Sequence, residues 1–298
     1  MGRAMTRTID SHCHFWTLSR GDYGWLSPDN DDLAAIYRDF GSADLNAAAA
    51  ASPVSARILV QAAPTTAETL FLLDLARQDE TSTGVVGWVD LSSPDSQAEI
   101  ETFSADPLFK SVRPMLQDLA DPNWIASAPH PGALDALVRL GLRFDALVTP
   151  LQLDALCRFA ENNGDLPIII DHAAKPAFKA PADDPRHGMW KDGMTRLARL
   201  SNVSCKLSGL LTELPGEAVS APQTAAAALR RHVGLLFEWF GPTRLAWGSD
   251  WPVLTLAASY AFWRQTTDLL LDDLSSNEKD AIMYGTAERF YGIEGAGR

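Results

Sequence analysis

Two histidines stand one residue apart near the start of the chain, in the sequence Ile-Asp-Ser-His-Cys-His-Phe-Trp over residues 9–16. The stretch from Thr8 has strand character, and side chains alternate between the two faces of a strand, so His12 and His14 project together while Cys13 points away. Neighbouring imidazoles can hold a divalent metal or polarise a carbonyl oxygen. Because the motif is only three residues long, a solvated or locally hydrogen-bonded pair is an equal alternative.

A carboxylate and a third imidazole follow two later apolar runs. Asp250 lies in Gly-Ser-Asp-Trp-Pro, where the proline ends a strand and leaves a carboxylate able to take a proton from water. The structural alternative is an aspartate that caps a helix or a turn. His172 comes directly after the β-branched run Leu166–Asp171, which is typical of a strand buried on both faces.

Basic and aromatic residues supply candidates for substrate binding. Arg113 lies near a strand end, and its planar guanidinium suits a carboxylate. Lys206 shares a strand face with two serines, and either substrate oxygens or a buried ion pair would satisfy this polar stripe. Trp25 lies in a turn-rich segment and either walls a pocket or covers one end of the fold. Gln117, four residues after Arg113, completes the substrate-binding candidates.

Strands and helices alternate along the whole chain. Eight stretches have strand character, namely the run from Thr8 and residues 57–61, 84–90, 110–117, 142–148, 166–171, 202–208 and 244–250. Helical stretches separate most of them, at 65–78, 95–103, 131–140, 150–162, up to 200, 224–240 and 255–271, and a last helix spans 276–290. Thr65 with Glu68 and Thr149 with Gln152 form capping boxes at two of the helix starts.

This alternation predicts a single (β/α)8 barrel over residues 8–298 with an additional C-terminal helix, preceded by a disordered or frayed segment 1–7. A doubly wound open sheet is the second choice, because no Gly-rich phosphate loop is present. Active sites of such barrels lie at the C-terminal ends of the strands. The fold would therefore bring His12, His14, His172 and Asp250 to one rim.

Composition limits the classes of partner. The formal net charge of −13 argues against nucleic acid, whose binding depends on Lys and Arg. No apolar run approaches the roughly 20 residues that span a bilayer, which argues against a membrane protein. Three cysteines far apart and no apolar signal segment favour a reduced, cytoplasmic protein. The oligomeric state stays open, a homo-oligomer included.

Several motifs in this order resemble those of one known group. They are Ser-His-Cys-His-Phe-Trp, Arg113-Pro-Met-Leu-Gln-Asp, Asp-His172-Ala-Ala-Lys-Pro, Cys-Lys206-Leu-Ser-Gly-Leu, Trp-Gly-Ser-Asp250-Trp-Pro-Val and Gly285-Thr-Ala. Together they resemble the amidohydrolase-related (amidohydrolase 2) lactonases of the amidohydrolase superfamily, which include fuconolactone hydrolase and 2-pyrone-4,6-dicarboxylate lactonase. The resemblance spans nearly the full chain and implies a distorted barrel with His12, His14, His172 and Asp250 as its reaction centre.

The chain departs from this group at a few positions. Relatives commonly have glutamine, histidine and glycine where Cys13, Pro114 and Ala174 stand. Pro114 removes a polar contact, which weighs against a sugar lactone. No carboxylatable lysine stands at the fourth strand, where Arg113 appears instead, so a bridged two-metal centre is not expected.

We therefore expect an ester hydrolase that opens the lactone ring of a sugar acid or a dicarboxylic acid. Asp250 would activate water. The three histidines would stabilise the oxyanion, either directly or through one bound zinc ion that is dispensable for catalysis. His12, His14, His172 and Asp250 are the expected zinc ligands. Two alternatives remain: a metal-dependent decarboxylase of the same superfamily, and a non-catalytic sugar-acid binding protein.

Overall fold

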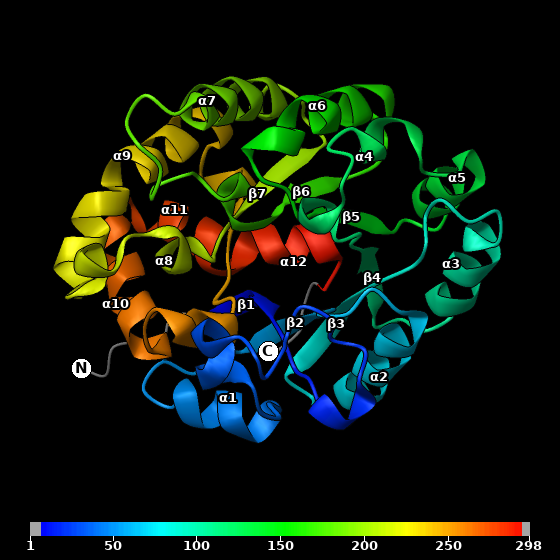
Figure 1. Ribbon diagram of the computed structural model, residues 1–298, viewed down its shortest axis with the longest axis horizontal. Helices are drawn as coiled ribbons and strands as arrows, with labels where there is room; N and C mark the ends of the chain where they lie inside the picture. Colours follow the sequence, from blue (N-terminus) through cyan, green and yellow to red (C-terminus); the bar gives the residue numbers. More distant parts are fainter. Residues whose placement is uncertain (1–6, 294–298) are drawn as a thin grey trace.

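Eight parallel strands follow one another around a nearly closed barrel in this computed structural model, which describes residues 7–293 (Figure 1). Each strand pairs with the next along the chain, so the spatial order is the sequence order. The strands are β1 Ile9–Cys13, β2 Ala56–Val60, β3 Ser82–Gly87, β4 Phe109–Val112, β5 Arg143–Ala146, β6 Ile168–Ile170, β7 Val203–Leu207 and β8 Leu245–Trp247. The predicted (β/α)8 barrel is confirmed. The predicted frayed segment 1–7 lies, except for Arg7, outside the described residues.

The seam between β8 and β1 is closed mainly by the residues around the strand ends. The Ser11 hydroxyl donates to the Trp247 carbonyl at 2.7 Å, and the Asp250 amide donates to the His12 carbonyl at 2.7 Å. The seam therefore fixes the backbone of Asp250 beside that of His12.

Helices surround the strands, as Figure 1 shows. They are α1 Ser42–Ala48, α2 Thr66–Arg77, α3 Ser96–Ser104, α4 Trp124–Ser127, α5 Pro131–Arg139, α6 Leu153–Asn162, α7 Pro185–Ala198, α8 Leu210–Glu213, α9 Pro222–Phe240, α10 Tyr260–Leu270, α11 Ser276–Asp280 and α12 Thr286–Tyr291. No described helix is long and apolar enough to cross a membrane.

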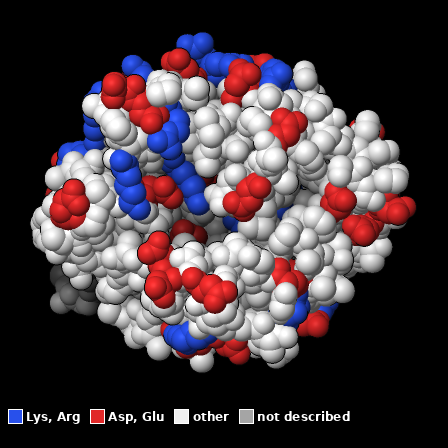
Figure 2. All heavy atoms as spheres, in the orientation of Figure 1, with Lys and Arg blue, Asp and Glu red and all other residues white. Residues whose placement is uncertain are grey.

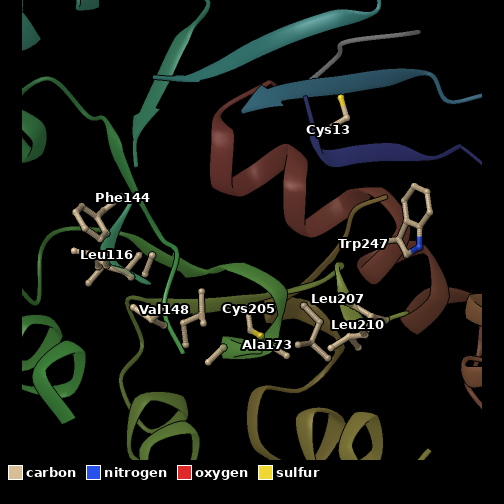
Figure 3. Close-up of a cluster of buried hydrophobic side chains, with 14 of the residues drawn as sticks. Cys13, Leu116, Phe144, Val148, Ala173, Cys205, Leu207, Leu210 and Trp247 are labelled. Carbon is tan, nitrogen blue, oxygen red and sulfur yellow. The ribbon is translucent and has the colours of Figure 1, made fainter. Parts of the chain in front are cut away.

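Two apolar layers hold the barrel together. The larger one packs the outer faces of the strands against the helices, and Figure 3 shows part of it around Phe144, Leu207 and Trp247. The smaller one fills the inside of the barrel with residues such as Ile58 and Ile169, which pack against Phe290 and other residues of α12. The Arg143 guanidinium, at the start of β5, donates to the Phe290 carbonyl at 2.5 Å. Helix α12 therefore plugs the end of the barrel where the strands begin.

The structure corrects several predicted boundaries. The predicted strands 110–117 and 244–250 end early, at Val112 and Trp247. The residues after them leave the hydrogen-bonded sheet and form loops at the rim of the barrel. Helix α1, between the first two strands, was not predicted. The C-terminal helix 276–290 contains a π-helical turn at Ala281–Gly285 between α11 and α12.

One of the two predicted capping boxes is complete. The Thr149 side chain caps the turn Pro150–Gln152 that leads into α6, and the Gln152 side chain returns the bond to the Thr149 amide. At α2, Thr65 accepts from the Glu68 amide, but the Glu68 carboxylate accepts instead from the Ala62 amide and the Tyr23 hydroxyl. The predicted capping box at α2 is therefore wrong, because the Glu68 carboxylate accepts from the buried Tyr23 hydroxyl instead of the Thr65 amide.

Candidate active site

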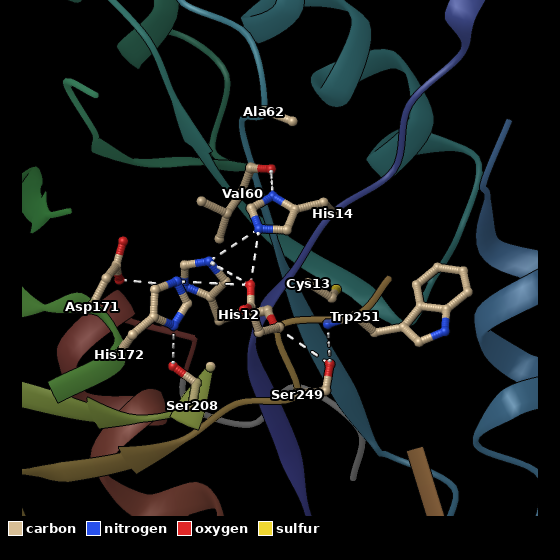
Figure 4. A network of polar contacts seen from close by, with 12 residues as sticks. His12, Cys13, His14, Val60, Ala62, Asp171, His172, Ser208, Ser249 and Trp251 are labelled. Carbon is tan, nitrogen blue, oxygen red and sulfur yellow. Dashed lines mark hydrogen bonds and ion pairs between the residues drawn. The ribbon is translucent and has the colours of Figure 1, made fainter. Parts of the chain in front are cut away.

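Residues from three distant parts of the chain meet at the rim where the strands end. His12 lies in β1 and His14 follows it, His172 follows β6, and Asp250 follows β8. Figure 4 shows the three imidazoles facing one another. The structure therefore brings together the four residues that the sequence singled out.

One oxygen of Asp250 lies among the three rings. Asp250 Oδ1 is 3.4 Å from His14 Nε2 and 3.7 Å from both His12 Nε2 and His172 Nε2. The Nε2 atoms of His12 and His14 are 3.2 Å apart. All four side chains are nearly buried, with Asp250 exposed by only 6%. Such a cup can orient one water molecule or one cation beside a carboxylate.

Backbone in the left-handed region aims two of these side chains. The run from His172 to Lys175 has φ between 47° and 57°, and Asp250 has φ 59°. Non-glycine residues rarely adopt this conformation, which costs about 1–3 kcal/mol each and tends to occur at functional sites. Gly209 packs directly against the pair, since a Cβ there would lie 2.4 Å from His172 Nδ1 and 3.0 Å from Asp250 Oδ2. The space that Gly209 leaves is therefore part of the site.

Each imidazole is oriented through its second nitrogen. His14 Nδ1 lies 2.7 Å from the Val60 carbonyl, which can only accept, so a neutral His14 has its lone pair on Nε2. His172 Nδ1 pairs with the Ser208 hydroxyl at 2.9 Å. His12 Nδ1 lies 3.0 Å from Lys206 Nζ and 3.3 Å from Asp171 Oδ1. The three Nε2 atoms are therefore directed toward the cup.

A layer of buried charge lies beneath the histidines. Lys206 Nζ is 2.5 Å from Asp145 Oδ2 and 2.9 Å from Asp171 Oδ1, and none of these side chains has exposed surface. The hydroxyl of Tyr291, from α12, donates to Asp145 Oδ2 at 2.7 Å. Of the two explanations for the polar stripe, the buried ion pair is the one that the structure contains. Lys206 reaches His12 rather than the open cavity.

Burial and neighbouring charges set the protonation of the site. Burial, and then the Lys206 ammonium, hold the pKa of His12 well below its usual range. Burial lowers the pKa of His172 to about 4, although Asp250 opposes the change. Burial raises the pKa of Asp250, but the three histidines outweigh it and leave this pKa below its usual value. At neutral pH the site therefore contains an ionised Asp250 and neutral His12 and His172.

A cavity of about 190 Å³ opens onto this cup, and His14, His172 and Asp250 line it. We call it the reaction cavity. Figure 2 shows a hollow near the centre of the molecular face, with charged side chains around it. Three of the predicted substrate-binding residues also line the reaction cavity: Arg113, Trp25 and Gln117.

These three residues differ in how they are held. Arg113 Nη1 is 3.3 Å from Asp171 Oδ2, and its Nη2 donates to the Gln61 carbonyl. The Trp25 indole donates to the Ala62 carbonyl at 2.7 Å. The side-chain amide nitrogen of Gln117 donates to Asp118 Oδ1 at 3.2 Å. No described residue donates to the side-chain carbonyl oxygen of Gln117, so this oxygen is available to a ligand.

One cavity-lining lysine and two buried aspartates of the site were not predicted from the sequence. Lys175 lines the reaction cavity, and no salt bridge to it occurs in the described part of the chain. Its place three residues after His172, on a loop that follows a strand, was the signal that could have found it. Asp145 and Asp171 stand within predicted strands and were not predicted as part of the site. The signal for them was a carboxylate in a buried apolar run, which needs a partner.

The cup fits one metal ion. Tetrahedral zinc with bonds of about 2.0–2.1 Å places its ligand atoms about 3.3 Å apart. Asp250 Oδ1 lies 3.4 to 3.7 Å from the three Nε2 atoms, and the Nε2 atoms of His12 and His14 are 3.2 Å apart. His12, His14 and Asp250 form one suitable group, and His172 belongs to a second group with His12 and Asp171. His172 Nε2 also lies 3.7 Å from Asp250 Oδ1. The hydrogen bond from His14 Nδ1 to a carbonyl is also typical of metal-binding histidines.

Comparison with known proteins gives consistent matches. The model of the family described as Amidohydrolase matches residues 9–293. An L-fucono-1,5-lactonase of Burkholderia ambifaria is 42% identical, with 97% of both chains covered, and an L-fucono-1,5-lactonase of Burkholderia multivorans is 34% identical, with 96% of both covered. A crystal structure of an amidohydrolase from Burkholderia multivorans with bound zinc has a TM-score of 0.85 and 32% identity, over 96% of this chain and 99% of that one.

Proposed function

The chain belongs to the amidohydrolase family, as its motifs predicted, and we propose that it is a lactonase that opens the 1,5-lactone of a sugar acid by hydrolysis. Both relatives named above are L-fucono-1,5-lactonases that match over nearly their full length. The observation that carries the mechanism is Asp250 Oδ1, which lies within 3.4 to 3.7 Å of three imidazole nitrogens at the mouth of the barrel.

Asp250 is the proposed general base. It is ionised at neutral pH, and its oxygen faces the cup in which a water molecule would sit beside the lactone carbonyl. Asp250 takes a proton from this water as the oxygen attacks the carbonyl carbon, and a tetrahedral oxyanion forms. Protonated Asp250 then gives its proton to the ring oxygen as the C–O bond breaks. The low pKa of Asp250 favours this second transfer.

The histidines are proposed to stabilise the oxyanion. A neutral imidazole donates from Nε2 only if Nδ1 accepts, and His12 meets this condition in the tautomer whose Nδ1 accepts from the Lys206 ammonium. The other tautomer, whose Nδ1 donates to Asp171 Oδ1, leaves the Nε2 lone pair available to a metal ion. A zinc ion bound by His12, His14, His172 and Asp250 would supply Lewis-acid polarisation of the carbonyl. The Arg113 guanidinium and the Lys175 ammonium, which has no salt bridge to a described residue, would hold substrate oxygens away from the reacting bond.

A pH-indicator assay with a panel of lactones tests the proposal, because hydrolysis releases acid. The panel contains L-fucono-1,5-lactone, other aldonolactones and 2-pyrone-4,6-dicarboxylate. We expect turnover of at least one sugar-acid 1,5-lactone, and we expect Asp250→Asn to lower kcat/KM by about 10² to 10⁴.

The Asn variant keeps the size of Asp250 and removes only the base. Full activity in this variant would rule out Asp250 as the base, and release of carbon dioxide from an aromatic acid without acid production would identify a decarboxylase instead. Retained binding without any turnover by the wild type would indicate a binding protein.

A further inference from the structure

A second and larger cavity adjoins the reaction cavity. It has a volume of about 540 Å³ and shares Trp25, Met115 and Asp118 with the wall of the reaction cavity. Two other tryptophans, Trp88 and Trp124, also line it. We call it the tryptophan annex, defined by Trp25, Trp88 and Trp124. A ligand bound at Asp250 can therefore extend into the annex without leaving the protein surface.

The annex is built by the loops at the active rim. Trp25 follows β1, Trp88 follows β3, and Trp124 lies beyond β4 at the start of α4. In a (β/α)8 barrel these loops contact the substrate, whereas the opposite end of the barrel serves stability. The annex thus lies on the functional side, next to the β1 end of the reaction centre.

The three indoles give the annex flat apolar faces. All three are only partly exposed, and Trp25 is fixed by its bond to the Ala62 carbonyl and by edge-to-face contact with Trp16 at 5.7 Å between ring centroids. A rigid indole face at the boundary of two cavities is a suitable stacking surface for a ring.

Three carboxylates give the annex its polar groups. Asp22 accepts from Arg20 and Thr65 on Oδ2. Asp90 and Asp118 receive their hydrogen bonds on Oδ1, so each of these two has a second oxygen to which no described residue donates. Asp22 Oδ1 has no donor among the described residues, but it is buried from solvent, and the Arg20 guanidinium pairs with Asp22 Oδ2 at 2.6 Å. No lysine or arginine of the described residues lines the annex.

We propose that the tryptophan annex binds a neutral, hydroxyl-rich ring attached to the lactone, so that the enzyme opens the lactones of disaccharide aldonic acids. This inference rests on the proposed lactonase function. An anionic group is disfavoured, because Asp90 and Asp118 have no salt bridge to any described residue and no described lysine or arginine lines the annex. A pure hydrocarbon would desolvate these carboxylates without giving them donors. A sugar ring stacks its C–H face on an indole and donates its hydroxyls to the free carboxylate oxygens.

The test compares lactobiono-1,5-lactone, which carries a galactosyl ring, with glucono-1,5-lactone. We expect Trp124→Ala to lower kcat/KM for the larger lactone about tenfold and to leave the smaller lactone within about twofold. Trp124 lines the annex and not the reaction cavity. Trp239→Ala is the matched control, because Trp239 is a partly exposed tryptophan of α9 that lines neither cavity. An equal loss on both lactones would overturn the proposal.

Binding of the hydrolysed acids separates the two proposals. Tryptophan fluorescence is titrated with lactobionate and with gluconate, which requires no turnover. Tighter binding of lactobionate that Trp124→Ala abolishes supports the annex even if no lactone is hydrolysed. Equal binding of the two acids overturns it, as does a preference for δ-decalactone over δ-valerolactone that depends on Trp124, since the annex would then hold hydrocarbon.

Discussion

Replacing Lys206 by methionine tests whether the charges beneath the histidines stabilise the barrel. Lys206, Asp145 and Asp171 have no exposed side-chain surface, and the ammonium lies 2.5 and 2.9 Å from the two carboxylates. Methionine keeps most of the apolar volume of the lysine stem but removes the charge. The two carboxylates then lose their shared counter-charge inside the barrel, where water cannot replace it.

The expected loss is large. Removing one partner of a buried ion pair costs about 3–5 kcal/mol, because the other partner stays behind as an uncompensated charge. For a chain of this size, 1 kcal/mol corresponds to a change in Tm of about 2 °C, so Lys206→Met should lower Tm by roughly 6–10 °C. Adding Asp145→Asn should recover about half of this loss, because Asp171 still has Arg113 at 3.3 Å.

Thermal unfolding followed by circular dichroism measures these differences at one pH and salt concentration. Lys191→Met is the control, because Lys191 is exposed on α7. Two results would refute the reasoning. One is a Lys206→Met variant whose Tm lies within about 2 °C of the control. The other is a double variant that is less stable than Lys206→Met alone.

Two further predictions concern the rim. Gly209→Ala should lower kcat/KM about 10- to 100-fold, because the φ of Gly209 is +63° and the new Cβ would lie 2.4 Å from His172 Nδ1. Gly188→Ala is the control and should leave activity unchanged, because a Cβ there meets nothing within 4 Å. Equal effects of the two substitutions would contradict this prediction. Burial raises the pKa of Glu68 from 4.5 to about 7, so the folded protein retains a proton there that the unfolded chain loses, and stability falls as the pH rises through this window. Glu68→Gln should therefore gain in Tm relative to the wild type between about pH 4.5 and 7.5, whereas a constant difference in Tm would count against the burial of a titrating carboxyl.

The alternation of strands and helices was enough to predict the barrel, because eight stretches have strand character and a helical stretch follows most of them. The barrel in turn predicted that His12, His172 and Asp250 would meet, since the topology places every strand end on one rim. The strand ends themselves were placed too late along the chain. Residues that directly follow the strands, such as Arg113, have side chains that also occur within strands. Only the three-dimensional geometry of the rim shows that these residues lie outside the hydrogen-bonded sheet.

A buried ion pair was one of two predicted explanations for Lys206, but its partners could not be predicted, because they come from distant parts of the chain. Asp145 lies in β5, Asp171 follows β6, and Tyr291 comes from α12, and only the closed barrel brings them to one point. The left-handed backbone at His172 was equally hidden. Left-handed turns usually require glycine, and the sequence there contains none, so the conformation depends on the packed surroundings rather than on local preference.

The buried charges also bear on the proposed role of Asp250 as the base. Three carboxylates, Asp145, Asp171 and Asp250, face two cations, Lys206 and Arg113, and all five side chains are exposed by 6% or less. These five charges sum to one negative charge in excess, and the three imidazoles and Lys175 lie next to them. A proton taken up by Asp250 removes the excess, and so does a cation bound among the histidines. Proton uptake at Asp250, the first step of the proposed hydrolysis, would therefore neutralise this excess charge. The histidines oppose it in the resting site, because they hold the pKa of Asp250 below its usual value and keep the carboxylate ionised.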